Sequence, residues 1–345
     1  MSLEHLWNEI RYYMNLEGSI KRIGTKFILA KTPLRKVVNT GIYSRIYEKK
    51  IKKKSKKIKP KFIQIENTNL CNARCIMCPH TIMKREKRTM KQEDFERIVE
   101  NIINNYPTIK RITITGFGEP FADKEIIKKI KFLNEKFQYI EIDIYTNASL
   151  LTRKMSDEIL NSEVHKINFS INGTGNTYGK MMGLDYENTI KNVSYFLKKK
   201  KELGKKFPLA NISFMIVREN EKDIENFQKF WMNRADSVMI YPPSDWAGRK
   251  KINYSSPIPF RKKRWACGAL WNYITVDVGG NIIMCCRDYE SEIKFGNLLK
   301  ENAKEIYEGK DMNEIREKQS RRDFSMPICN NCDNSFDSSM EWWNI

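Results

Sequence analysis

The sequence predicts an α/β protein built on a parallel sheet, with a basic helical extension before it and a small cysteine-rich unit after it. Between residues 61 and 241, strand-like apolar runs alternate with helix-like stretches, which is the pattern of βα units. The residues before this region show only helical periodicity, and the residues after it carry five of the eight cysteines. We therefore expect three parts, comprising residues 1–60, 61–241 and 242–345.

The N-terminal extension combines amphipathic helices with a run of lysines. Apolar residues recur at spacings of three and four on both sides of Pro33: Leu3, Leu6, Trp7, Ile10 and Met14, then Val38, Ile42 and Ile46. Residues 49–61 hold nine lysines in thirteen positions. Because like charges repel, this run is expected to be a solvated connector or an electrostatic contact surface. Contact with anionic lipid headgroups and a plain linker both stay open, and RNA is less favoured.

Composition excludes several classes of protein. A hydrophobic content of 41% over 345 residues is ordinary for a globular protein, and no run of eighteen apolar residues marks a membrane span. The N-terminus lacks a signal-peptide core, so we expect a cytoplasmic protein with peripheral membrane contact as an option. Clustered cysteines in such a chain favour reduced metal ligands over disulfides. Of the net charge of +20, residues 1–62 account for +13, which places the basic character in the extension.

The sheet region contains six expected βα units, too few for a closed eight-stranded barrel. Strands are expected near residues 61–66, 111–115, 139–145, 166–171, 211–217 and 237–241. Helices are expected near residues 91–105, 123–136, 153–161, 186–203 and 222–233. In parallel α/β sheets the functional loops gather at the carboxyl ends of the strands, so each strand end is a candidate site.

Three cysteines follow the first expected strand. Cys71, Cys75 and Cys78 form a CxxxCxxC spacing. A 4Fe-4S cube held by only three thiolates keeps one iron open for a small molecule, whereas a structural zinc site wants four ligands. The motif resembles that of the radical S-adenosylmethionine (radical SAM) superfamily. The resemblance implies a partial (βα)6 TIM-like barrel, a 4Fe-4S cluster, and reductive cleavage of S-adenosyl-L-methionine to a 5′-deoxyadenosyl radical that abstracts hydrogen from carbon.

Further motifs follow the next strands in the order that this family shows. After the second strand, Gly116, Phe117, Gly118, Glu119 and Pro120 resemble the family's glycine-rich motif that holds the methionine amino group, with Phe117 where many members have glycine. Thr146 and Asn147 resemble the turn near the ribose and methionine, and Ser170 lies in a turn similar to a further cofactor contact. The family's usual carboxylate-binding arginine is replaced by Met182, which leaves Lys180 or Arg218 as the candidate partner. Met77 stands where many members have an aromatic residue.

The C-terminal cysteines indicate a second metal site. Cys267 precedes an expected hairpin over residues 273–284, Cys285 and Cys286 follow it, and Cys329 and Cys332 form a CxxC pair. As bare spacing this fits a four-cysteine zinc site. The stretch resembles the SPASM/twitch auxiliary domain, which implies a second 4Fe-4S cluster. The ligands implied are Cys267, Cys285, Cys329 and Cys332, with Cys286 as the alternative to Cys285.

Two smaller features also contain candidate residues. Asp245, Trp246 and Gly248 follow the sixth strand and are either substrate contacts or parts of a linker. The three histidines, His5, His80 and His165, belong to no recognisable ligand or nucleophile motif. The sequence assigns no catalytic acid or base.

The function that the resemblance implies is oxidation of substrate carbon. The auxiliary cluster would accept the electron that a carbohydrate-like, lipid-linked or phosphorylated substrate releases, and a flavodoxin or ferredoxin would be the reductant. A radical SAM peptide maturase is the first alternative. A non-enzymatic iron-sulfur or RNA-binding protein is an alternative of another class, and it leaves the motif with Glu119 unexplained.

Overall fold

The computed structural model describes residues 57–241, 243–253, 264 and 266–332, together with residues 49, 51, 53 and 55. Its centre is a single nine-stranded sheet with the order β6-β5-β4-β3-β2-β1-β7-β8-β9. The strands are β1 (Phe62–Ile65), β2 (Arg111–Ile114), β3 (Glu141–Thr146), β4 (Val164–Ser170), β5 (Leu209–Met215), β6 (Ser237–Tyr241), β7 (Tyr273–Val276), β8 (Asn281–Ile283) and β9 (Lys294–Asn297).

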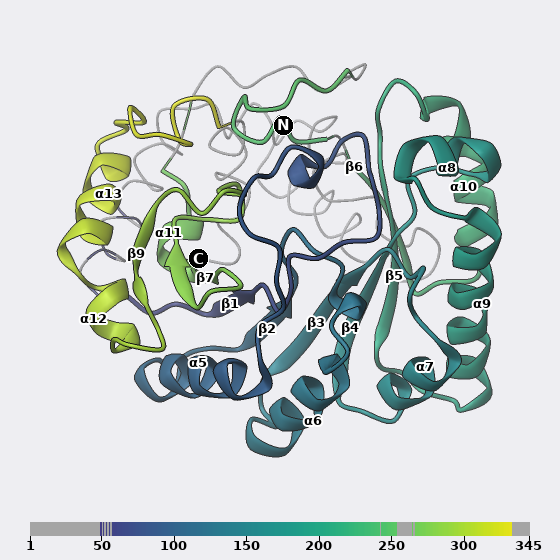
Figure 1. Cartoon of the computed structure of the whole chain (residues 1–345), viewed down its shortest axis with the longest axis horizontal. Helices are drawn as coiled ribbons and strands as arrows, with labels where there is room; N and C mark the ends of the chain where they lie inside the picture. The colour runs from purple at the N-terminus through teal and green to yellow at the C-terminus, as the bar shows by residue number, and fades with distance from the viewer. Residues whose placement is uncertain are drawn as a thin grey trace, which may run out of the picture.

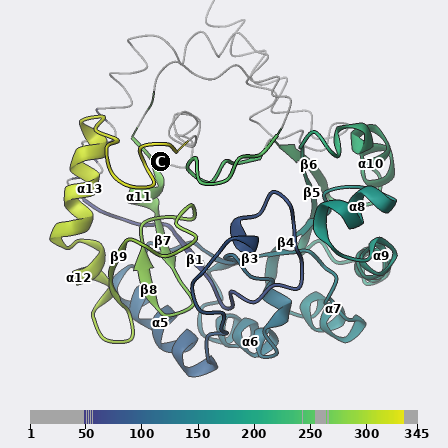
Figure 2. The same ribbon diagram turned by 45° about the horizontal axis from the view of Figure 1, so that its top comes forward.

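Helices cover the outside of this curved sheet (Figures 1 and 2). The α-helices are α5 (Gln92–Asn105), α6 (Ile126–Lys136), α7 (Arg153–Leu160), α8 (Gly175–Met182), α9 (Tyr186–Glu202), α10 (Ile224–Trp231), α11 (Ala269–Asn272), α12 (Ala303–Tyr307) and α13 (Lys310–Ser320). Among the residues that the structure describes, three 3-10 turns lie at η1 (Pro79–Thr81), η2 (Pro120–Ala122) and η3 (Glu221–Asp223).

Strands β1 to β6 pair in parallel in their sequence order, so the predicted open, partial barrel is confirmed. All six expected strands and five expected helices are present, with bounds that differ by no more than three residues. The prediction omitted α8, which follows β4 and ends at Gly183 with a φ of +65°. Such a left-handed residue is a common way to end a helix, and glycine adopts it without steric cost.

The two faces of the sheet differ in chemistry because side chains alternate along each strand. One face carries apolar residues such as Ile65, Ile114 and Phe169, which are fully buried under the helices. The alternate face carries polar and charged residues, among them Lys166 of β4, whose ammonium lies 2.8 Å from the Asp143 carboxylate of β3. The outer, helix-facing side of the barrel is therefore apolar, and its inner side is polar.

The sheet continues across the predicted boundary at residue 242. Strand β7 pairs in parallel with β1, placing Ile63 beside Ile274, and the β7–β8 hairpin with β9 extends the sheet. The C-terminal unit therefore shares backbone hydrogen bonds with the barrel. The division into domains stays a prediction, since a continuous sheet joins the two parts.

The lysine run before β1 is not wholly solvated. The side chain of Ile51 is only 2% exposed and belongs to the hydrophobic core. The Ser55 hydroxyl donates to the Ile51 carbonyl (3.1 Å) and accepts from Trp271 Nε1 (3.1 Å). The prediction of a solvated connector or contact surface did not include this packing. The uncharged residues of the run recur at helical spacing and give it one face that can pack against the core. The helices predicted over residues 1–47 lie outside the described residues. Within the described part of the chain, no helix is long and apolar enough to cross a membrane.

Candidate functional site

The CxxxCxxC loop over residues 71–78 lies between β1 and η1, at the carboxyl end of the first strand. Its backbone is fixed to the end of α8, because the N–H of Arg74 donates to the Met182 carbonyl (2.8 Å) and the N–H of Ile76 donates to the Met181 carbonyl (3.0 Å). The position where the family's arginine is expected therefore serves, through its backbone, to hold the cysteine loop.

The three thiols of this loop lie close enough to influence one another. Burial raises the pKa of Cys71 to about 12, and the nearby charges of Glu119 and Cys78 add to the effect. Burial likewise raises the pKa of Cys75, followed by the charges of Cys78 and Cys71, and burial raises the pKa of Cys78. The isolated thiols are thus held protonated, so metal binding would release protons.

The donor set fits an iron-sulfur cluster. Thiolates are the ligands of such clusters, and a cube takes one thiolate at each of three separate irons. Among the described residues, no three His, Cys, Asp or Glu side chains converge tightly enough to hold a single metal ion. A cube held at separate irons does not require that convergence.

The glycine-rich motif packs directly against the start of the cysteine loop. A Cβ atom at Gly118 would lie 2.2 Å from the Thr68 carbonyl oxygen and 2.7 Å from that of Leu70, so only glycine fits. The N–H of Glu119 donates to the same Leu70 carbonyl (2.8 Å). Pro120 is held through its carbonyl oxygen, which accepts from Asn67 Nδ2 (3.2 Å).

Glu119 is the centre of a buried hydrogen-bond network at the strand ends. Its carboxylate accepts from Thr146 Oγ1 (2.6 Å) and from the N–H groups of Asn147 (2.7 Å) and Phe121 (3.1 Å). Asn147 Nδ2 in turn donates to Asn72 Oδ1 (3.1 Å) within the cysteine loop. Burial raises the pKa of Glu119 to about 7, against the opposing effect of these hydrogen bonds. Three predicted motifs therefore meet at one carboxylate.

The remaining predicted cofactor contacts are more scattered. Ser170 ends β4, is partly buried, and accepts a long hydrogen bond from Asn168 Nδ2 (3.5 Å). Lys180 is exposed on α8, and Arg218 is exposed after β5. In the contacts of the described residues, neither cation joins the Glu119 network. The choice between these two cations as partner of the methionine carboxylate stays a prediction.

Phe117 joins an aromatic cluster between the barrel and the C-terminal unit. It packs with Met83, Tyr289 and Trp246, and its ring centroid lies 5.7 Å from that of Trp246 and 6.1 Å from that of Tyr289. The side chain that stands where many family members have glycine thus contacts Tyr289 of the auxiliary region.

Glu66 forms a buried ion pair that no sequence motif indicates. The guanidinium of Arg85 donates to both Glu66 oxygens (2.6 and 2.7 Å), and the same carboxylate accepts from the N–H groups of Phe117 (2.9 Å) and Val278 (3.1 Å). Glu66 therefore ties β1 to the glycine-rich motif and to the β7–β8 hairpin. The sequence showed Glu66 only as a strand end, and no motif marked Arg85.

The C-terminal cysteines come together from three separate segments. Burial raises the pKa of Cys285 well above its ordinary value, and the charges of Cys286, Cys267 and Cys332 add to this. Burial and then Cys332 raise the pKa of Cys329 to about 12. Cys286 is exposed, unlike Cys285, which favours Cys285 as the ligand. Cys285 is thus influenced by Cys267 and Cys332, and Cys329 by Cys332. These four thiols are the number that a cluster with a thiolate on every iron requires.

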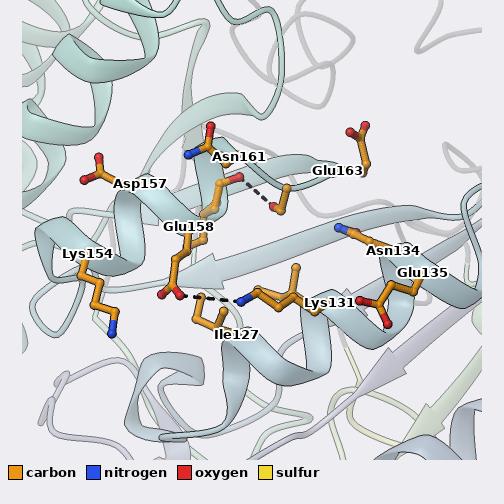
Figure 3. Close-up of a pocket in the computed structure, with 12 residues that line it drawn as sticks. Ile127, Lys131, Asn134, Glu135, Lys154, Asp157, Glu158, Asn161 and Glu163 are labelled. Carbon is orange, nitrogen blue, oxygen red and sulfur yellow. Dashed lines mark hydrogen bonds and ion pairs between the residues drawn. The ribbon is translucent and has the colours of Figure 1, made fainter.

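A surface hollow on the outer helices lies away from these sites. It has a volume of about 650 Å³ and lies between α6 and α7 (Figure 3). An ion pair between Lys131 and Glu158 (3.9 Å) crosses its wall. None of the predicted site residues lines it, so it adds nothing to the chemistry of the strand ends.

Comparison with known families agrees with this geometry. Residues 65–230 match the model of the radical SAM superfamily, and residues 267–333 match SPASM, an iron-sulfur cluster-binding domain. The chain belongs to the radical SAM superfamily. The domain matches support a radical SAM 4Fe-4S cluster that works with S-adenosylmethionine, and an auxiliary iron-sulfur cluster in the SPASM domain.

Curated relatives of this radical SAM enzyme have varied activities. It is 25% identical over 186 residues to the tungsten-containing aldehyde ferredoxin oxidoreductase cofactor-modifying protein of Pyrococcus furiosus, which covers 52% of this chain and 50% of the relative. It is 26% identical over 229 residues to a GTP 3′,8-cyclase of Listeria welshimeri, covering 64% of this chain and 66% of the relative. The chain thus spans from about half to two thirds of the length of these relatives.

Solved structures of other radical SAM enzymes share the fold. BtrN in complex with AdoMet and 2-DOIA has a TM-score of 0.54 at 17% identity, covering 80% of this chain and 92% of BtrN. Streptococcus suis SuiB bound to the precursor peptide SuiA has a TM-score of 0.61 at 19% identity, covering 78% of this chain and 69% of SuiB. At these identities the likeness describes the architecture and leaves the substrate open.

Proposed function

We propose that this radical SAM enzyme oxidises a hydroxyl-bearing carbon of a carbohydrate-like substrate, with the auxiliary cluster as electron acceptor. The observation that carries the proposal is the auxiliary thiol set. Cys267, Cys285, Cys329 and Cys332 would provide one thiolate for each iron of a cube and would leave no iron open to bind substrate, so electron transfer is the role that remains for the cluster.

The proposed reaction uses two clusters that differ in their ligands. One delivers the electron that cleaves S-adenosylmethionine, and the other accepts the electron that the substrate releases. Cys71, Cys75 and Cys78 would hold the cluster that passes one electron from a flavodoxin- or ferredoxin-type reductant to S-adenosylmethionine, which would give methionine and a 5′-deoxyadenosyl radical. The substrate C–H hydrogen passes to this radical and gives 5′-deoxyadenosine. The substrate radical then loses its hydroxyl proton to solvent and one electron to the auxiliary cluster, which leaves a carbonyl. The substrate is thereby oxidised by two electrons, and S-adenosylmethionine is consumed as methionine and 5′-deoxyadenosine.

The polar face of the barrel supports a polyhydroxylated substrate. Asn168 Nδ2 donates to Ser213 Oγ (2.8 Å), and Asn211 and Ser237 continue this ladder across β5 and β6. Uncharged hydroxyl and amide groups of this kind are well suited to hydrogen-bond sugar-like hydroxyls. BtrN, whose fold this chain shares, has been solved with 2-DOIA, a small-molecule ligand, beside AdoMet.

Cofactor binding is proposed to follow the strand-end motifs. Gly116 and Gly118 let the backbone approach S-adenosylmethionine, Glu119 accepts from its ammonium group, and Thr146, Asn147 and Ser170 line the adjoining strand ends. Lys180 and Arg218 are the two candidates for its carboxylate. Comparing S-adenosylmethionine affinity in Lys180→Met and Arg218→Met variants decides between them, because only the true partner's loss should weaken binding.

Anaerobic reconstitution tests the central proposal. We expect about eight irons per chain, 5′-deoxyadenosine formation under reductant, and a product two hydrogens lighter than the substrate. Substrate deuterated at the reacting carbon should transfer one deuterium to 5′-deoxyadenosine. Four irons with bound zinc would rule out the auxiliary cluster, and deuterium transfer without a two-hydrogen loss would rule out oxidation.

Peptide modification is the second candidate, favoured by the shared fold with SuiB in its complex with the precursor peptide SuiA. A product that is a crosslinked or oxidised peptide would favour this candidate. The lysine-rich extension, whose sequence predicts helices, does not resemble the strand-containing leader-binding domain expected of such maturases. We therefore place it second.

The proposed partners are a small-molecule or lipid-linked anionic substrate and a flavodoxin- or ferredoxin-type reductant. We propose a cytoplasmic protein whose residues 1–60 contact anionic membranes peripherally, on the ground of their +13 charge. Co-sedimentation with anionic vesicles at low salt tests this. Equal binding by the full chain and by a chain beginning at Lys61 would exclude the role of the extension.

A further inference from the structure

The connector between barrel and auxiliary domain places one cation at each cysteine loop. It runs from residue 243 to residue 266, and the structure describes residues 243–253, 264 and 266 of it. Lys250 Nζ donates to the Cys78 carbonyl (2.8 Å) and to Thr81 Oγ1 (2.9 Å). Its charge interacts with both Cys78 and Cys75 of the CxxxCxxC loop.

Arg264 makes the corresponding contacts at the other end of the connector. Its guanidinium donates to the carbonyls of Cys329, of Asn330 (2.9 Å) and, at longer range, of Cys332 (3.4 Å). The guanidinium also lies over the Phe324 ring, 4.3 Å from its centroid. Two cations from one segment therefore hold the carbonyl groups of ligand cysteines in two different proposed clusters.

The path of the connector fixes Lys250 in place. Trp246, Ala247 and Gly248 have successive φ values of +54°, +62° and +76°, a conformation that costs energy for the first two residues. Trp246 Nε1 donates to the Met77 carbonyl (2.8 Å), one residue before Cys78. Gly248 passes so close to the CxxC segment that a Cβ there would lie 3.0 Å from the Asn331 Cβ. The strained turn thus bridges the two cysteine loops.

We propose that Lys250 and Arg264 set the reduction potentials of the radical and auxiliary clusters, respectively. A thiolate-ligated cluster is anionic and gains one more negative charge on reduction, so a fixed cation beside it favours the reduced form. Removing the cation lowers the potential of the adjacent cluster. The inference rests on the proposed ligand sets and goes beyond them, because neither residue is a ligand.

Other charges near the radical cluster determine which substitutions should change its reduction potential most. Lys87 interacts with Cys71 and Cys78 but is exposed, so solvent screens it more than the partly buried Lys250. The charge of Glu119 acts on Cys71 and Cys75 in the sense opposite to that of the two cations. We expect Lys250→Met to change the one-electron reduction equilibrium by about tenfold, equivalent to 59 mV, and Lys87→Met to change it less.

Redox titration monitored by electron paramagnetic resonance, without substrate or S-adenosylmethionine, tests the proposal. Lys250→Met should lower the potential of the radical cluster alone, and Arg264→Met that of the auxiliary cluster alone. Lys250→Arg and Arg264→Lys, which keep the charge, should retain the native potentials. Lys250→Gln keeps a hydrogen-bond donor without the charge and should behave like Lys250→Met. Lys251→Met removes an equal charge from the next, exposed residue and should leave both potentials unchanged.

Several outcomes would overturn the proposal. Unchanged potentials in Lys250→Met and Arg264→Met, or equal shifts of both clusters in either variant, contradict a local effect. Loss of iron from both Lys250→Met and Lys250→Gln would assign Lys250 to cluster assembly and also overturn it. A wrong assignment of the cysteine ligands would be recognised separately, because Cys71→Ala or Cys332→Ala would then keep about eight irons per chain.

Discussion

The two cysteine sites of this enzyme are assembled in different ways. The radical-cluster cysteines lie within eight residues of one loop, and that loop is held by α8 and by the network around Glu119. The auxiliary cysteines span residues 267–332 and meet only when the hairpin, α11 and the CxxC segment pack together. The three ligands of the first site are close in sequence and need other elements only to fix their loop, whereas the four-ligand site requires distant segments to come together in the finished fold.

The largest expected effect separates the two sites by chemistry. Alanine at Cys71, Cys75 or Cys78 should abolish cleavage of S-adenosylmethionine and remove about four irons. Alanine at Cys329 or Cys332 should spare part of the cleavage and stop substrate turnover, because the radical still forms but the electron has no acceptor. Measuring 5′-deoxyadenosine and product in parallel checks this. Unaltered product formation by Cys332→Ala would contradict the claim that substrate turnover needs the auxiliary cluster.

The next effect concerns the link between the two regions. Arg85→Met leaves the buried Glu66 carboxylate without its cation and should lower the free energy of unfolding by about 3–5 kcal/mol. Arg249→Met removes the more exposed pair with Glu292 and should cost at most about 1 kcal/mol. Urea unfolding of the two variants measures the difference. Equal losses would show that the Glu66 contacts do not hold the auxiliary hairpin to the barrel.

A smaller effect sharpens the role of Glu119. The pKa of Glu119 is raised to about 7, and an ammonium group binds the ionised carboxylate, so affinity for S-adenosylmethionine should fall about tenfold for each pH unit below 7. Glu119→Gln should bind weakly at every pH, with no such slope. Calorimetry between pH 6 and pH 8 checks this, and a slope that persists in Glu119→Gln would assign the titration to another group.

The same pKa shift predicts how stability depends on pH without the cofactor. The folded-state pKa of Glu119 is raised above the ordinary value of 4.5. The contribution of Glu119 to the free energy of unfolding is therefore fully present below about pH 4.5 and is lost as the pH rises through about 7. Glu119→Gln should remove this part of the pH dependence from denaturant unfolding curves. An unchanged pH profile would contradict the assignment.

The smallest expected effect distinguishes two neighbouring cysteines of the auxiliary site. Cys286 is exposed and Cys285 is enclosed, so Cys286→Ser should keep about eight irons and native turnover. Cys285→Ser should lose the auxiliary cluster. Iron analysis and absorption spectra of the pair decide the ligand, and the reverse result would make Cys286 the ligand.

The sequence alone determined the features that depend on local pattern. Alternating strand and helix periodicity placed six parallel strands within three residues of their bounds, and spacing placed the CxxxCxxC loop and the motif with Glu119 at strand ends. Parallel strands bring their carboxyl ends to one edge, which is why motifs far apart in sequence, at Asn72, Glu119 and Asn147, could be expected to meet.

Only the tertiary structure decided the contacts that no local pattern encodes. The pairing of β7 with β1, the Arg85 pair with Glu66, and the positions of Lys250 and Arg264 beside the cysteine loops join residues that are far apart in the chain or lie in different elements. Ile51 is buried within a lysine-rich run because an apolar surface is available there in the folded chain. Such contacts depend on which surfaces the completed sheet brings together, and the periodicity of side chains along the sequence does not predict which surfaces meet.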